Sequence, residues 1–345
     1  MKKTKVLIVD DSALIRLLLS EILSNDNEIE VVGVASDPFE AREKIKRTSP
    51  DVITLDIEMP KMDGLTFLKN LMRLRPMPVV MISTLTQKGA DVTLQALELG
   101  AFDFVCKPSK DVKENLSEYG EEICRKVKAA AESRPQERVS STVGKVDLPR
   151  KIEMSSIDII AIGASTGGTE AIKEVITRLP LGMPPIVIAQ HIPDVFSTSY
   201  AKRLNSLTEL TVSELRESQI LKSNNVYIAP GDDHLYIKSV GQELVGKIKK
   251  TEPINRHRPS VDVLFESVAR EVGRKAIGIL LTGMGSDGAR GLLMMKQAGA
   301  LTFAQDRESS VVWGMPGKAV AIDAVNKVLP LNKIASTLVR SVSLS

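Results

Sequence analysis

The chain has 345 residues, a formal net charge of +3 and only 3% aromatic residues. This length fits two domains, and so small a charge with so few aromatic rings argues against a nucleic-acid partner. No stretch approaches the roughly 20 apolar residues that cross a membrane, and the run Val6–Val9 is too short for a signal peptide. The sequence therefore predicts a cytoplasmic protein that is not inserted in a membrane.

Short apolar runs alternate with helical patterns through the first 133 residues. The strands are predicted at Val6–Val9, Ile29–Val34, Val52–Leu55, Val79–Ile82 and Phe102–Cys106. Such strands, separated by helices, indicate a parallel sheet covered on both faces. Asp37 followed by Pro38 marks the start of one helix, and leucines recur at helical spacing between Leu14 and Ile22 in another. Five of these units predict a doubly wound α/β domain over residues 1–133.

A polar stretch that contains Pro and Gly follows, and we expect a linker over residues 134–155. A second α/β pattern fills residues 156–345. Its strands are predicted at Ile157–Ile162, Ile186–Ala189, Val226–Ala229, Ile277–Leu281 and Leu301–Ala304. Tyr236–Lys238 and Leu244–Lys249 flank a glycine turn and indicate a β-hairpin. We therefore predict a second doubly wound domain, mostly parallel and of the α/β hydrolase type, with one hairpin.

Chemically active residues follow four of the strands in the first half. They are Asp10 and Asp11, Asp56, Ser83 and Lys107. Because the carboxyl ends of parallel strands meet at one edge of a sheet, we expect these side chains to lie together. Clustered carboxylates repel one another, which a hard cation such as Mg²⁺ relieves, and an aspartate beside Mg²⁺ and a lysine is suited to accept a phosphoryl group. A single aspartate could equally be a strand-end cap, but the recurrence favours a site.

Three segments resemble the signature of response-regulator receiver domains. They are Val6-Leu7-Ile8-Val9-Asp10-Asp11-Ser12, residues 55–64 and Lys107-Pro108. The resemblance covers about residues 3–131 and implies a flavodoxin-like receiver whose Asp56 is phosphorylated by a chemotaxis histidine kinase. It implies that Mg²⁺ is held by Asp10, Asp11 and Asp56. Ser83 and Lys107 would sense the phosphoryl group, and Phe104 would be an aromatic that swings inward on activation, although an ordinary core position is an equal alternative for it.

The segment Gly163-Ala164-Ser165-Thr166-Gly167 matches Gly-x-Ser-x-Gly between a strand and a helix. That context is typical of a nucleophile elbow, in which glycines permit a tight turn and the serine is exposed at the strand end. A glycine-rich phosphate-binding loop is the rival interpretation, although the Gly-Lys-Ser/Thr of a Walker loop is absent. The loop alone leaves both open.

A serine nucleophile needs a base and a group that orients the base. Of the histidines His191, His234 and His257, His191 is favoured as the base because it follows a predicted strand, with a strand-end cap as the alternative. Asp287 follows another predicted strand and is the candidate orienting group. Its alternative role is the N-cap of a helix predicted over Ala289–Ala298.

Four further segments resemble the catalytic domain of chemotaxis protein-glutamate methylesterases. They are residues 162–168, residues 189–193, residues 255–262 and residues 281–288. The resemblance spans about residues 157–334 and implies hydrolysis of glutamate methyl esters on methyl-accepting chemoreceptors, with deamidation of receptor glutamines in many members, and no cofactor for the ester step. It implies Ser165 as nucleophile, His191 as base and Asp287 as orienting group. The backbone N–H groups of Thr166 and Met284 are predicted to form the oxyanion hole. It also implies that the unphosphorylated receiver covers the hydrolase cleft.

The sequence departs from that family at three positions near the C-terminus. Arg307 stands where an acid is more frequent, Ser310 where a cysteine is, and Trp313 replaces a smaller aromatic. These changes bear on the selectivity of the substrate groove. Two other function classes stay open: a response regulator whose second domain binds nucleotide through residues 163–168, and a DNA-binding regulator, against which the missing basic recognition helix argues.

Overall fold

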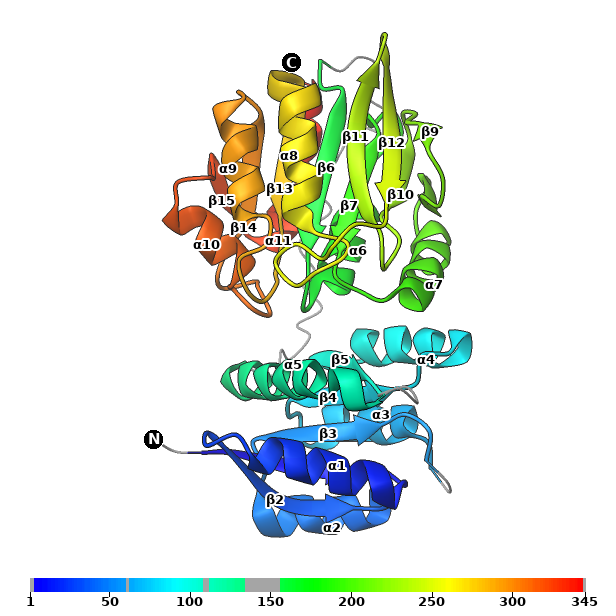
Figure 1. Cartoon of the computed structure of the whole chain (residues 1–345), viewed down its shortest axis with the longest axis vertical. Coiled ribbons are helices and arrows are strands. Elements are labelled where there is room, and N and C mark those ends of the chain that lie inside the picture. Colours follow the sequence, from blue (N-terminus) through cyan, green and yellow to red (C-terminus); the bar gives the residue numbers. More distant parts are fainter. Residues whose placement is uncertain (1–2, 60–61, 108–111, 134–155, 344–345) are drawn as a thin grey trace. The chain divides into compact units, whose positions relative to one another are not determined.

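The computed structural model describes residues 3–59, 62–107, 112–133 and 156–343. The chain divides into two compact units, Met1–Ser141 and Thr142–Ser345. Each unit is an α/β fold built on a parallel sheet, which confirms the predicted fold class (Figure 1). The predicted linker over residues 134–155 lies outside the described residues.

The first unit holds a five-stranded parallel sheet in the order β2-β1-β3-β4-β5. Its strands are β1 (Thr4–Val9), β2 (Ile29–Ala35), β3 (Val52–Asp56), β4 (Val79–Ser83) and β5 (Asp103–Cys106). Its helices are α1 (Ala13–Ser24), α2 (Pro38–Thr48), α3 (Gly64–Leu74), α4 (Gln87–Glu98) and α5 (Val112–Glu132). This strand order is the flavodoxin-like one that was predicted. Because α1 packs against α5 and α3 against α4, helices cover both faces of the sheet (Figure 1).

Side-chain caps explain where several of these helices begin. The carboxylate of Asp37 accepts hydrogen bonds from the first backbone N–H groups of α2, and Pro38 opens the helix, as predicted. The leucine pattern in α1 correctly predicted a helix. However, Leu14 and Leu17 are 72% and 68% exposed, whereas Leu19 and Leu23 face the core. Leucines surround α1 on most sides, so periodicity alone did not identify the buried face.

The second unit holds a seven-stranded parallel sheet in the order β15-β14-β13-β6-β7-β10-β8 and a three-stranded antiparallel sheet in the order β11-β12-β9. The strands are β6 (Ile159–Ala164), β7 (Ile186–Gln190), β8 (Thr211–Glu214), β9 (Gln219–Ile220), β10 (Asn225–Ile228), β11 (His234–Val240), β12 (Glu243–Lys249), β13 (Ala276–Leu280), β14 (Leu301–Gln305) and β15 (Lys327–Leu329). The helices are α6 (Gly168–Ile176), α7 (Asp194–Asn205), α8 (Val261–Glu271), the short 3₁₀ helix η1 (Gly273–Lys275), α9 (Ala289–Gln297), α10 (Met315–Ala321) and α11 (Leu331–Ser343).

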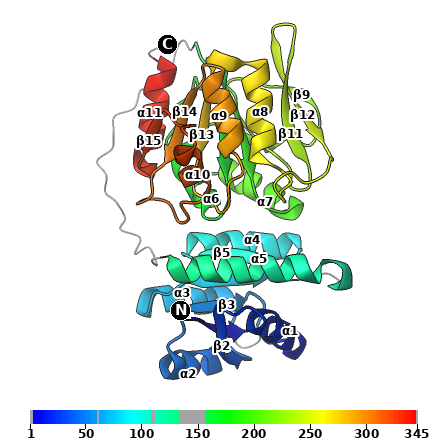
Figure 2. The same ribbon diagram turned by 60° about the vertical axis from the view of Figure 1, so that its left-hand side comes forward.

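Helices lie on both faces of the seven-stranded sheet. α8 packs against α9 on one face, and α11 packs against α6 on the other (Figure 2). The hairpin of β11 and β12 packs against α8, and its strands pair up to Val240 and Glu243, so the predicted hairpin is confirmed. The core is built from the central strands, where every residue of β6, β7 and β13 is buried.

All five strands predicted for the main sheet of this unit are present within two or three residues of their predicted bounds. The sequence analysis missed β8, β9 and β15. These strands are short and lie at sheet edges, where only one side is paired and few side chains are buried. Within the described ranges, no helix combines the length and apolarity needed to cross a membrane.

Candidate functional site

Ser165 sits in a tight turn between β6 and α6. The backbone N–H of Gly168 donates to the carbonyl of Ser165 (2.7 Å), and the amide of Gln190 donates to the same oxygen (2.9 Å). Gly167 has φ +75°, which favours glycine, and a Cβ atom on Gly168 would collide with Gln190. The half-buried Ser165 is therefore held at the carboxyl end of β6, as a nucleophile elbow requires.

His191 follows the adjacent strand β7 and lies beside the elbow. Its backbone N–H donates to the carbonyl of Ala164, the residue before Ser165 (3.2 Å). Its ring Nε2–H donates to Oδ2 of Asp287 (2.8 Å), and both side chains are nearly inaccessible to solvent. The other ring nitrogen, Nδ1, is buried and has no hydrogen-bond partner among the residues that the structure describes. The imidazole thus has one nitrogen engaged by a carboxylate and one available for a proton.

Asp287 is buried beneath the start of α8 and accepts several hydrogen bonds there. Its donors besides His191 are Asn255 Nδ2 (2.7 Å), Ser260 Oγ (2.8 Å) and the backbone N–H groups of Val261 (2.7 Å) and Asp262 (3.2 Å). Burial alone would raise the pKa of Asp287, but the hydrogen bonds from His191, Asn255 and Val261 outweigh it and hold the pKa well below its ordinary value. The carboxylate is therefore charged at neutral pH.

The alternative role of Asp287 as N-cap of α9 is wrong, because the N-cap of that helix is Gly288. Its carboxylate instead accepts the first backbone N–H groups of α8, a helix distant in sequence. A cap supplied from outside its own helix leaves no local pattern, so the sequence analysis could not find it.

The other two histidines have different surroundings. His234 is completely buried in β11, where its Nε2–H donates to the carbonyl of Glu252 (3.0 Å) and its Nδ1 accepts from the backbone of Ser260 (3.1 Å). His257 stacks on the ring of His191, with 3.7 Å between ring centroids and 13° between ring planes. No role for His257 or Asn255 was predicted from the sequence; their only signal was their position in a segment that resembled the family.

The two candidates for the oxyanion hole flank Ser165. Thr166 is the next residue of the elbow and is buried, and its carbonyl accepts from the hydroxyl of Thr282 (3.0 Å). Met284 is half-buried in the loop after β13. A Cβ atom on the preceding Gly283 would lie 2.8 Å from Cβ of Ser165, so this loop passes directly beside the serine.

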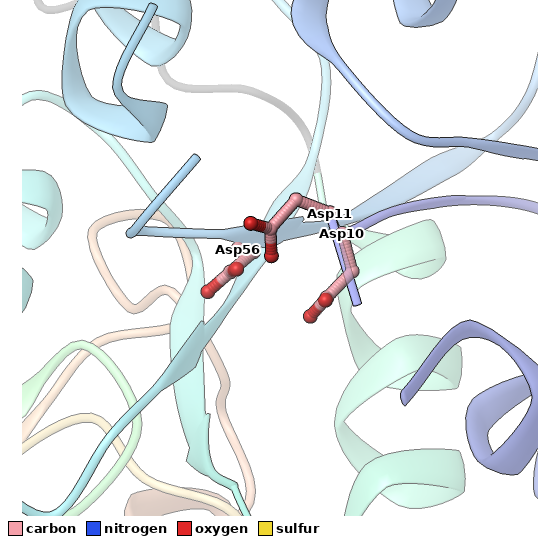
Figure 3. Close-up of side chains that lie close together, drawn as sticks. All are labelled: Asp10, Asp11 and Asp56. Carbon is pink, nitrogen blue, oxygen red and sulfur yellow. The ribbon is translucent and has the colours of Figure 1, made fainter. Parts of the chain in front are cut away.

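The carboxylates at the ends of β1 and β3 of the first unit lie together (Figure 3). One oxygen from each of Asp10, Asp11 and Asp56 lies within 4.8 Å of the others. Asp10 and Asp56 are buried, and Nζ of Lys107 lies 3.0 Å from Oδ2 of Asp10 and 2.9 Å from Oδ2 of Asp56. Two of the three carboxylates pair with one ammonium group, and this all-oxygen set fits a hard divalent cation such as Mg²⁺.

The electrostatics of this cluster reflect crowding of like charges. Burial raises the pKa of Asp56 to about 6, and the charge of Asp10 adds to that effect while Lys107 opposes it. Burial likewise raises the pKa of Asp10. Burial would lower the pKa of Lys107, but Asp56 and Asp10 outweigh it and raise the pKa. The charged form of Asp56 is therefore destabilised even beside Lys107, and a divalent cation bound at the cluster would stabilise it.

The remaining predicted switch residues are placed as follows. The backbone N–H of Lys107 donates to the carbonyl of Ser83 (2.6 Å), but the hydroxyl of Ser83 faces α4, where Oγ1 of Thr93 donates to it (2.7 Å). Phe104 is 5% exposed, and Nζ of Lys126 lies 5.3 Å from its ring centroid. The structure thus brings Lys107 to Asp56 but turns the Ser83 hydroxyl away from it. The switch roles of Ser83 and Phe104 stay predictions.

We expect Asp56→Asn to stabilise the first unit at pH 7.5 without divalent metal, by roughly 1–3 kcal/mol for a pKa shift of about two units. Because the pKa of Asp56 is about 6 when folded and 3.8 ordinarily, the folded chain binds more protons between these values, and stability is lost as the pH rises through them. Asparagine does not titrate and so avoids that loss. The difference in the free energy of unfolding between Asp56→Asn and the wild type should therefore vanish below pH 4. Hydrogen exchange of the β1 and β3 amides would measure it.

Asp26→Asn is the matched control for that experiment. The pKa of Asp26 is lowered: burial opposes this change, but the ion pair with Lys128 outweighs it. Asp26→Asn should therefore lower the free energy of unfolding at neutral pH, whereas Asp56→Asn should raise it. A loss of stability for Asp56→Asn at pH 7.5 would contradict the expectation.

Comparison with known proteins identifies the family of the chain. A family model described as CheB methylesterase matches residues 160–338, and one described as the response regulator receiver domain matches residues 6–117. The chain belongs to the CheB methylesterase family. Both resemblances noted in the sequence are thereby confirmed.

Two relatives match this CheB family member over nearly its whole length. A protein of Hydrogenovibrio crunogenus named protein-glutamate methylesterase/protein-glutamine glutaminase is 50% identical, with 97% of each chain covered. A protein of Saccharophagus degradans with the same name and the number 2 is 52% identical, with 99% of each chain covered. The crystal structure of the CheB methylesterase catalytic domain of Thermotoga maritima is similar to the second unit, with a TM-score of 0.53 and 39% identity over 54% of this chain and 99% of that chain.

Proposed function

We propose that the chain is a phosphorylation-controlled protein-glutamate methylesterase that also deamidates protein glutamines, with methyl-accepting chemoreceptors as its substrates. The observation that carries the proposal is the pairing of His191 with the buried Asp287 beside the elbow that holds Ser165. The names of the two full-length relatives support the substrate class.

In this mechanism Ser165 attacks the ester carbonyl while Nδ1 of His191, the nitrogen that Asp287 does not engage, takes its proton. Asp287 fixes the ring and stabilises the imidazolium that forms. The backbone N–H groups of Thr166 and Met284 stabilise the oxyanion. The imidazolium of His191 then gives its proton to the departing methoxide, which leaves as methanol. A water that His191 activates hydrolyses the acyl-serine, which restores Ser165 and leaves a glutamate side chain on the substrate protein. A glutamine amide follows the same path and loses ammonia.

The first unit acts as the receiver in this proposal. A chemotaxis histidine kinase of the cytoplasm supplies the phosphoryl group, and Asp56 accepts it. Asp10, Asp11 and Asp56 would hold Mg²⁺, which when bound neutralises charge on the transferring group. Lys107, already within 2.9 Å of Asp56, pairs with the new phosphoryl oxygens. We assign residues 1–133 to the receiver, 134–155 to a linker and 156–345 to the catalytic domain.

The nucleotide-binding alternative for the second unit is not favoured. A phosphate loop needs backbone N–H groups that point at the ligand. Here the N–H of Gly168 is used inside the turn by the carbonyl of Ser165, and the side chains of Gln190 and Val311 crowd the glycines. The elbow geometry therefore supports a serine hydrolase.

The test is methanol release from methylated chemoreceptor membranes by the intact chain and by Ser165→Ala, each with and without a small-molecule phosphodonor and Mg²⁺. We expect release by the intact chain, stimulation by the phosphodonor, and a loss of at least about 10⁴-fold in Ser165→Ala, because only background catalysis remains without the nucleophile. Asp56→Asn is the control for the receiver: it should keep the basal rate and lose the stimulation.

Release that persists in Ser165→Ala would disprove the proposed nucleophile. Stimulation that persists in Asp56→Asn would show that the phosphodonor acts elsewhere. Absence of release under every condition would disprove the proposed substrate.

A further inference from the structure

Residues 254–257 form a tight turn next to the candidate triad. The backbone N–H of Ile254 donates to the carbonyl of His257 (3.1 Å), and the N–H of His257 donates back to Ile254 (2.9 Å). The central residues, Asn255 and Arg256, both have left-handed backbones, with φ of 54° and 66°. Two consecutive left-handed residues between a reciprocally bonded pair make a two-residue hairpin turn of fixed shape. The turn therefore sets where Asn255 and His257 lie relative to each other.

Asn255 and His257 of this turn contact different members of the triad. Nδ2 of Asn255 donates to Oδ1 of Asp287 (2.7 Å) and to Oδ2 of Asp262 (2.8 Å). The ring of His257 lies flat against the ring of His191, 3.7 Å away. One turn of fixed shape thus contacts both the carboxylate and the imidazole.

These contacts restrict the motions that the Asp287 hydrogen bond alone permits. A single bond at Nε2 fixes one point of the His191 ring, but the ring can still tilt about that point. A second flat ring stacked at van der Waals distance opposes the tilt. Because Nδ1 has no hydrogen bond among the described residues, no hydrogen bond on that edge of the ring fixes its plane.

We propose that the Ile254–His257 turn is a positioning element of the active site, in which His257 holds the plane of the His191 ring and Asn255 holds the Asp287 carboxylate. The inference rests on the proposed roles of Ser165, His191 and Asp287. Neither residue transfers a proton in it: the flat shape of the His257 ring is what matters. A misplacement of catalytic groups by about 1 Å can lower turnover about 100-fold.

The experiment uses the full chain and two readouts. The first is the second-order rate at which a fluorophosphonate probe labels Ser165, which reports nucleophile activation without receptor binding; the second is kcat and KM for methanol release. The variants are His257→Ala, which removes the ring, His257→Phe, which keeps a flat ring without a titrating group, and Asn255→Gly, which keeps the left-handed backbone and removes only the amide.

Asn224→Gly is the matched control. Asn224 is also left-handed (φ 63°), and its side chain accepts a hydrogen bond from Gly182 (2.6 Å) at the amino end of the strands, away from the triad. Asn224→Gly should lose stability as Asn255→Gly does, but the probe should label its Ser165 at the wild-type rate.

We expect His257→Ala to slow labelling and lower kcat by about 10- to 100-fold with KM unchanged. His257→Phe should recover most of that loss, and Asn255→Gly should lose about 3- to 10-fold, since other donors to Asp287 remain. Wild-type labelling by His257→Ala would overturn the inference. The inference would also be overturned if His257→Phe labelled Ser165 as slowly as His257→Ala, because that result would assign a chemical role to the imidazole of His257. A wild-type chain that labels at Ser165 but releases no methanol would disprove the proposed substrate alone, and the labelling rates would still decide this inference.

Discussion

Replacing Asp287 with asparagine is expected to lower kcat for methyl ester hydrolysis by about 10⁴-fold. Asparagine has a similar shape, but one of its terminal atoms donates rather than accepts. That group would replace either Oδ2, which accepts from His191 and the backbone N–H of Val261, or Oδ1, which accepts from the backbone N–H of Asp262. Each of these donors needs an acceptor. Facing His191, the donating group would favour the tautomer with the proton on Nδ1, which leaves no base for Ser165. Steady-state methanol release and fluorophosphonate labelling would both measure the loss.

Asp262→Asn provides the matched control for this substitution. Asp262 is a neighbouring buried carboxylate that accepts from Asn255 (2.8 Å) and from the backbone of Gly291 (2.7 Å). Burial raises its pKa, and His191 is bonded to the other aspartate. Because the pKa of Asp262 is raised and that of Asp287 is lowered, Asp287→Asn should lose more stability at neutral pH than Asp262→Asn. Asp262→Asn should keep kcat within about tenfold of wild type. Equal losses of kcat would contradict a specific role for Asp287.

Gly283→Ala is expected to lower kcat by about 10²-fold. Its new methyl group would collide with the sulfur of Met315 and lie 2.8 Å from Cβ of Ser165, which is closer than such atoms normally approach. Either Ser165 or the loop that carries Met284 must shift, and a displacement of about 1 Å can cause such a loss. Gly283 has an ordinary backbone conformation, so crowding alone would cause the effect.

Gly278→Ala is the control that distinguishes crowding at Ser165 from overpacking elsewhere in the core. Gly278 lies in β13, the strand that precedes the Gly283 loop, and its new methyl group would approach the flexible ends of Leu292 (2.7 Å) and Met295 (2.8 Å). Both substitutions should cost about 1–3 kcal/mol of stability through overpacking. Only Gly283→Ala should reduce the rate of labelling at Ser165, and an equal reduction in Gly278→Ala would show that the effect is not local.

The parts of the fold that the sequence predicted well are those where burial decides the structure. Central parallel strands such as β6 and β13 are buried on both faces, so their composition is apolar and conspicuous. Edge strands such as β15 carry no such signal, since two of its three residues are exposed. In α1 the helix was predicted but its buried face was not, because leucines occur nearly all around it.

The candidate sites divide in a similar way. Strand ends could be aligned from the sequence, so the neighbourhoods of Asp10 with Asp56 and of Ser165 with His191 were predictable. Contacts that reach a site from a segment distant in sequence were not predictable. The hydrogen bond of Asn255 to Asp287 and the stacking of His257 depend on a left-handed turn whose course across the sheet edge no local pattern reveals. The direction of the Ser83 hydroxyl, toward Thr93, is likewise a matter of rotamer and packing.

The hydrogen bonds that α8 donates to Asp287 tie the chemistry to the cooperativity of folding. The first N–H groups of a helix need acceptors, and here the acceptor is the same carboxylate that engages His191. Loss of that acceptor frays α8, and fraying of α8 releases the histidine. Heat or denaturant should therefore extinguish hydrolysis and unfold this unit in a single transition, without a folded but inactive intermediate in between.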